Sequence, residues 1–149
     1  MDSVYDAVGA ERLNALAAAW HRRVLADDVV SHAFHGEAKH DHTERLAAYW
    51  AEALGGPADY SSRFGDESFV VRMHSGNGEH HEMDERAIAC FDAALAEVGL
   101  DADERLRSTL HDYFAWATIS SMAQYPGSQD DVPAGIPMPR WSWDGLVTT

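Results

Sequence analysis

The run Leu54-Gly55-Gly56-Pro57-Ala58-Asp59-Tyr60-Ser61, followed eight residues later by Phe69-Val70-Val71-Arg72-Met73-His74, decides how this chain folds. Proline lacks the N–H that a helix needs, so the glycine–proline break ends the helix before it. The apolar stretch then ends on a histidine, and Ser75-Gly76-Asn77-Gly78 stops any further helix. Neutral imidazole is the commonest metal-ligating side chain. His74 is therefore either a metal ligand at the edge of a core or a histidine that only packs near a helix end.

The chain on both sides of this stretch has a helical pattern. Its first long segment is rich in good helix formers, and Leu13, Leu16, Trp20 and Val24 recur at helical spacing. A polar segment with Gly36 indicates a loop between the second and third helices. We expect helices over residues 11–26, 27–34, 41–54, 82–98 and 101–125, with a less regular stretch from Gly55 to Gly65.

The last part of the chain differs from the rest. Prolines from Pro126 onward exclude a long helix, yet Trp141 and Trp143 are large apolar rings that rarely remain free of contacts. We expect a helical domain over residues 1–125 and an extended tail over 126–149 that packs back onto it. A disordered end is the alternative.

Bulk properties narrow the choice of function. The chain has 149 residues, the size of one domain, and a net charge of −14 from 25 acidic and 11 basic residues. Such a charge repels nucleic acid and anionic membranes, so neither is an expected partner. Cys90 is the single cysteine, which excludes an intrachain disulfide. No apolar run is long enough for a membrane span and no secretory signal is visible, so we expect a cytoplasmic protein. We expect it to be a monomer or a homodimer.

Several motifs occur in an order typical of one family. The chain opens on Tyr5-Asp6-Ala7-Val8-Gly9, continues through the Gly-Gly-Pro-x-x-Tyr-Ser loop to His74, and reaches a further segment over Arg86 to Phe91. Over residues 4–122 this series resembles the truncated haemoglobins, group II most closely. The resemblance implies an all-α truncated globin fold, a two-over-two helical sandwich, here with an extended C-terminal tail. It also implies haem b as cofactor, with His74 as the ligand of its iron.

The same resemblance implies which residues surround the haem. Phe34 would pack on the porphyrin, Leu46 would lie on the distal helix face, and two aromatic residues one turn on would form further walls. Two arginines would pair with the propionates, because charge-assisted hydrogen bonds are strong, or would simply be solvated at the surface. The aromatic residues are Tyr49 and Trp50, and the arginines are Arg45 and Arg72.

The distal side departs from the family pattern. His42 falls at the distal gate, His21 stands where a tyrosine is usual, and Ala87 replaces a tryptophan if Cys90 aligns with the family's cysteine. A neutral imidazole has one N–H donor, so either histidine could donate a hydrogen bond to dioxygen. His42 could instead ligate the iron, or the pair could act as general base and acid on peroxide, unless these side chains point to solvent. The small Ala87 would leave room for a substrate larger than dioxygen.

The resemblance implies three functions: oxygen binding, nitric oxide detoxification and peroxidase-like turnover. The expected ligand is a diatomic gas or peroxide, or else a small organic substrate. An unidentified reductant is the other expected partner. One alternative is a globin fold without haem that serves as an interaction or sensor module. Another is a non-haem metal enzyme that uses the histidine-rich loop, because imidazole and carboxylate groups also bind zinc and non-haem iron. That loop contains His35, Glu37, His40, Asp41 and His42.

Overall fold

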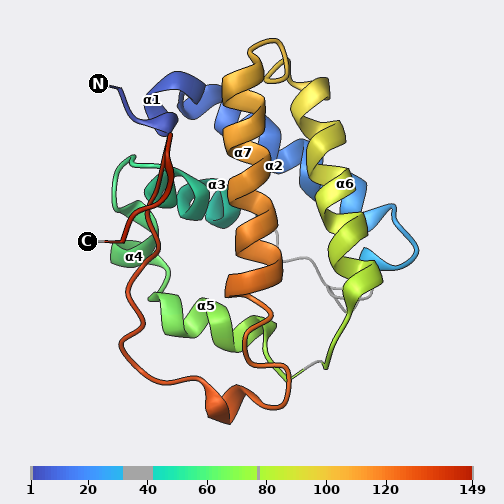
Figure 1. Ribbon diagram of the computed structural model, residues 1–149, viewed down its shortest axis with the longest axis vertical. Helices are drawn as coiled ribbons and strands as arrows, with labels where there is room; N and C mark the ends of the chain where they lie inside the picture. The colour runs from blue at the N-terminus through green and yellow to red at the C-terminus, as the bar shows by residue number, and fades with distance from the viewer. Residues whose placement is uncertain (1, 32–41, 77, 149) are drawn as a thin grey trace.

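The computed structural model describes residues 2–31, 42–76 and 78–148, and these residues form an all-α body as predicted. Two pairs of long helices make up this body: α2 and α3 form one pair, and α6 and α7 form the other (Figure 1). α2 packs against both α3 and α6, and α6 packs against α7. The bounds are Ala10–Leu25 for α2, His42–Ala53 for α3, His81–Glu97 for α6 and Glu104–Trp116 for α7. No helix among the described residues is long and apolar enough to cross a membrane.

Three short helices complete the body: α1 (Val4–Val8), α4 (Asp59–Arg63) and α5 (Glu67–His74). The Asp66 side chain caps α5 by accepting a hydrogen bond from Phe69 N at 2.8 Å, which is why the apolar stretch begins as a helix. At its other end, α5 stops at His74, because Ser75 after it is extended. This agrees with the sequence pattern. α4 lies in the stretch that we expected to be poorly regular.

The Gly55-Gly56 pair lets the N-terminal helix lie directly against the end of α3. Tyr5 N donates to Leu54 O at 3.0 Å across this contact. Gly55 has a φ of 97°, and a Cβ on Gly56 would lie 2.7 Å from the Tyr5 ring. Neither position accommodates a side chain, so the Tyr-Asp-Ala-Val-Gly opening and the glycine loop form one packed unit.

Two expected helices are only partly matched by the described residues. Asp27 Oδ1 accepts hydrogen bonds from Val29 N and Val30 N, and the chain continues as a tight turn, while the expected end near Phe34 lies outside the described residues. The helix expected over residues 101–125 begins at Glu104 with Asp103 as its cap. After Trp116 it widens into a π-helix, η2 (Ala117–Ser121).

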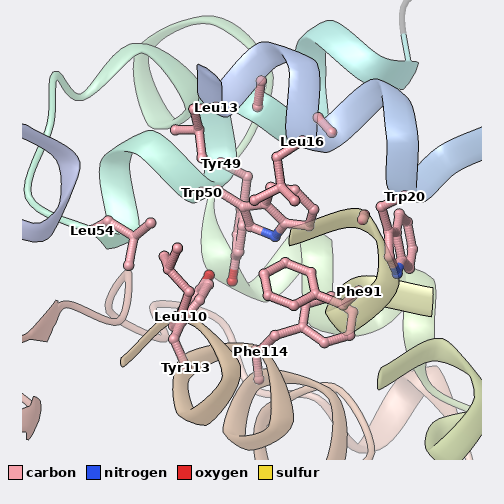
Figure 2. Close-up of a cluster of buried hydrophobic side chains, with 14 of the residues drawn as sticks. Leu13, Leu16, Trp20, Tyr49, Trp50, Leu54, Phe91, Leu110, Tyr113 and Phe114 are labelled. Carbon is pink, nitrogen blue, oxygen red and sulfur yellow. The ribbon is translucent and has the colours of Figure 1, made fainter. Parts of the chain in front are cut away.

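An aromatic cluster fills the space between the helix pairs (Figure 2). Phe91 of α6 and Phe114 of α7 stack with ring centroids 4.2 Å apart. Trp50 of α3 meets both phenylalanine rings edge-on, and the Trp20 ring meets Trp50 at 6.0 Å. Edge-to-face and offset contacts of this kind are the favoured aromatic geometries. The cluster therefore links all four long helices.

The tail returns to the helical body over most of its length. It contains the 3₁₀-helix η3 (Gln129–Asp131) and a small antiparallel hairpin of β1 (Trp141–Ser142) and β2 (Gly145–Leu146). Trp141 packs on the rings of Tyr113 and Trp116 of α7. Trp143 Nε1 donates to Asp2 O at 2.9 Å, which brings the two ends of the chain to one side of the molecule (Figure 1).

Candidate functional site

His74 is the last residue of α5, and its ring has a defined orientation. His74 Nδ1 lies 2.8 Å from Val70 O, one turn back on the same helix. A backbone carbonyl can only accept, so Nδ1 carries the proton and Nε2 keeps its lone pair. A histidine that ligates a metal almost always donates its other N–H in this way. The end of α5 therefore holds His74 in the tautomer whose Nε2 can donate an electron pair to a metal.

The surroundings of His74 keep this donor available. Val70 lies one turn back on α5 and belongs to the buried core, whereas His74 keeps access to solvent. The protein around the imidazole desolvates it enough to lower its pKa, and the hydrogen bond to Val70 O partly opposes this. The lowered pKa favours the neutral imidazole, the form that binds a metal.

Hydrogen bonds from the tail hold α5 in place. Ser68 Oγ donates to Pro133 O at 2.8 Å and accepts from Ile136 N at 3.0 Å. Arg72 Nη2 donates to Val132 O at 3.1 Å, so its guanidinium contacts the tail. The helix that presents His74 is thus fixed by a segment about sixty residues further along the chain.

His21 and His42 come together although they lie on different helices. The centroids of the two imidazole rings are 4.3 Å apart, and the ring planes make an angle of 30°. Thr43 Oγ1 lies 3.4 Å from His21 Nδ1, and both histidines are half-buried. Burial lowers the pKa of His21, so this ring too is neutral at pH 7 and has one N–H donor and one acceptor.

Ala87 lies beside a tryptophan from another helix. Trp20 Nε1 donates to Ala87 O at 3.1 Å, and both residues are buried. The indole of α2 therefore occupies space next to the position where we expected room for a larger substrate. The Trp20 N–H points to the Ala87 carbonyl and not to an open space. The imidazoles of His21 and His42 contribute further polar groups to this region.

The remaining predicted pocket residues lie at different depths. Leu46 packs against the core, and Trp50 belongs to the aromatic cluster. Tyr49 is buried, and its hydroxyl donates to the Glu67 carboxylate, at 2.7 Å from Oε1. The Arg45 guanidinium lies over the Phe64 ring, 4.9 Å from its centroid. Phe34 lies outside the described residues.

These features agree with comparisons to known proteins. Residues 3–118 match the model of the family described as bacterial-like globin. The chain belongs to that family. No curated protein sequence is significantly similar to this globin.

Several solved truncated haemoglobins and related globins share its fold. A thermostable haemoglobin from Thermobifida fusca is 26% identical, with a TM-score of 0.69 over 81% of this chain and 97% of that protein. The truncated oxygen-avid haemoglobin of Bacillus subtilis is 20% identical, with a TM-score of 0.70 over 83% and 100%. The group II truncated haemoglobin of Bacillus anthracis is 16% identical, with a TM-score of 0.69 over 85% and 94%. The predicted truncated globin fold is confirmed.

Haem is the cofactor that this family membership implies, and the residues present fit it. The lone pair of His74 Nε2 suits iron, and Val70 of α5 and Leu46 of α3 are apolar side chains of the kind that surround a porphyrin. Within residues 2–31, 42–76 and 78–148 no group of three histidine, cysteine or acidic side chains could hold a metal ion. The loop His35, Glu37, His40 and Asp41 lies outside the described residues.

Two residues that shape the site were missed from the sequence. Glu67 follows the capping Asp66 and has the pattern of a solvated helix start, yet it is only 3% exposed. Ser68 has the same polar pattern and is fully buried. The only sequence signal for their burial was the Trp141 and Trp143 pair, which indicated a packed tail but not its position.

Proposed function

We propose that His74 is the axial iron ligand of this globin. The observation that carries the proposal is the 2.8 Å hydrogen bond between His74 Nδ1 and Val70 O, because it selects the tautomer and fixes the ring. A ring held by its own helix loses little freedom on ligation. The hydrogen bond also raises the basicity of the opposite nitrogen, which strengthens its bond to a metal.

We further propose that His21 and His42 form the distal polar group of this pocket. Haem supplies an iron centre for diatomic ligands and for electron transfer, and its distal surroundings decide among these uses. Two adjacent imidazoles offer N–H donors to a diatomic ligand, and a neutral ring also has a lone pair that accepts a proton. This arrangement supports gas binding, and it also supports acid–base assistance to peroxide or nitric oxide chemistry with an external reductant.

The first experiment is a haemin titration of the apoprotein followed by its absorption spectrum. Wild type should give a sharp Soret band at one equivalent, and His74→Ala should give a broadened and weaker band. His81→Ala is the matched control, because His81 is an exposed histidine at the start of α6. Free imidazole should restore the band of the His74→Ala protein. An unchanged spectrum in His74→Ala would refute proximal ligation.

The ferrous spectrum separates the distal roles. A low-spin spectrum that becomes high-spin in His42→Leu indicates that His42 ligates the iron. A high-spin wild type whose oxygen affinity falls in His42→Leu indicates a hydrogen-bond donor. If neither the spin state nor the affinity changes in His42→Leu or in His21→Leu, the distal assignment fails.

A further inference from the structure

A half-open cavity lies on the tail side of the molecule. Its volume is about 470 Å³, within the range of sites that hold small organic ligands. The start of α5, the end of α7, the π-helix η2 and the tail line it, and none of His21, His42 and His74 does. The lining residues that matter here are Glu67, Trp116, Ser121, Gln124, Met138 and Arg140.

The walls of this tail cavity are mainly apolar and its floor is acidic. Trp116 and Met138 provide apolar surface, together with prolines of the tail. Glu67 is 3% exposed and Ser121 is 6% exposed, so both belong to the buried floor. The wide turn of η2 brings Ser121 close enough to the Glu67 carboxylate to affect its pKa.

The carboxylate of Glu67 has hydrogen-bond partners but no cation. Among the described residues, none of the ion pairs includes Glu67, although Tyr49 Oη donates to it at 2.7 Å. The one arginine of the cavity, Arg140, donates to Glu52 O and lies 3.9 Å from the Glu52 carboxylate. A buried carboxylate without a counter-charge is costly, and a ligand that supplies the charge recovers that cost.

We propose that the tail cavity binds a small organic amine, whose ammonium group pairs with Glu67 and whose apolar body lies against Trp116 and Met138. The net charge of −14 attracts such a cation over longer distances. Haem ligation by His74 is not a premise of this proposal.

The groups that face Glu67 set its protonation. Burial is the main cause that raises the pKa of Glu67 to about 7, and the hydrogen bonds from Tyr49 and Ser121 oppose it. The other titratable groups nearby are Glu52, Tyr60, Asp66 and Tyr113, and Arg140, which lines the same cavity, pairs with Glu52. An ammonium ligand favours the ionised form, so binding near pH 7 should release protons from Glu67, because a group close to its pKa is partly protonated.

The test is isothermal titration calorimetry of the haem-loaded chain with 2-phenylethylamine. We expect saturable one-to-one binding that weakens at least tenfold in Glu67→Gln and is unchanged in Glu85→Gln, a matched exposed position on α6. Titrations in two buffers of different ionisation enthalpy should show that binding at pH 7 releases protons from the wild type and none from Glu67→Gln.

Two further measurements guard against a folding artefact. Ser120→Phe adds bulk to an exposed wall position of the tail cavity and leaves Glu67 untouched, so it should also weaken binding. The acid 3-phenylpropionate has a similar body with the opposite charge, and it should not bind. The proposal is overturned by preference for the acid, by full affinity in Glu67→Gln, or by no binding of the amine at millimolar concentration.

Discussion

The imidazole rings of His21 and His42 lie nearly face to face across the contact between α2 and α3, with centroids 4.3 Å apart. Two rings at this distance would repel each other if both were protonated, so the pair disfavours a double positive charge. A neutral imidazole in this pair supplies an N–H donor together with a lone pair that accepts a proton. A single distal tyrosine or tryptophan would supply a donor but not a neighbouring base.

Removing either imidazole should speed oxygen release. We expect His42→Leu and His21→Leu to raise the oxygen dissociation rate about 10- to 100-fold for the residue that donates, because a hydrogen bond to a charged or strongly polarised group contributes about 1.5–3 kcal/mol. Stopped-flow dissociation measurements test this, with His81→Leu as an exposed control. Unchanged rates in both variants would remove the pair from the ligand site.

The Trp20 indole should contribute to stability through its hydrogen bond to Ala87 O. Trp20→Phe keeps a ring in the aromatic cluster but leaves that buried carbonyl without its 3.1 Å donor, at a cost of about 1–3 kcal/mol. Trp143→Phe is the control, because its bond to Asp2 O is solvent-exposed and water can replace it. Urea unfolding at pH 7 measures both. Equal losses in the two variants would show that the buried bond adds nothing.

Local patterns in the sequence predicted much of this fold. Leu13 and Leu16 repeat at helical spacing and are buried in α2, and the Gly55-Gly56 break ends α3 as expected. The length of the last helix was wrong, because no helix breaker precedes Pro126. The change to a π-helix after Trp116 accompanies burial of Ser121 beside Glu67, a contact that local propensity does not encode.

The position of His74 was predictable because one element defines it, whereas contacts between distant segments were not. The sequence indicated that His74 ends a short element before a glycine-rich break, and α5 ends there, while its role as an iron ligand stays a prediction. The contact of Trp20 with Ala87 joins residues 67 positions apart, and that of Ser68 with the tail joins residues 65 and 68 positions apart. Such contacts depend on how whole helices pack, so residue type and spacing alone did not indicate them.

Loss of the Ser68 hydroxyl should loosen the helix that carries His74. Ser68→Ala leaves Pro133 O and Ile136 N without their buried partner, and we expect a loss of about 1–3 kcal/mol in the free energy of unfolding. We also expect faster transfer of haem to apomyoglobin, because α5 becomes less rigid. Ser62→Ala removes only an exposed hydroxyl and is the control. A stable variant with unchanged haem transfer would mean that the tail does not support α5.

Glu67 should give the fold a distinct dependence on pH. The pKa of Glu67 is about 7 in the folded chain and 4.5 in the unfolded chain. Between these two pH values the folded state therefore holds a proton that the unfolded state has lost. Stability then falls as pH rises through this window, by on the order of 2–3 kcal/mol between pH 5 and pH 8. Glu67→Gln cannot ionise, so its stability relative to wild type should improve by that amount over the same range. Urea unfolding at several pH values measures the difference. A pH-independent difference for Glu67→Gln would mean that the carboxylate is solvated, which the buried contact with Tyr49 argues against.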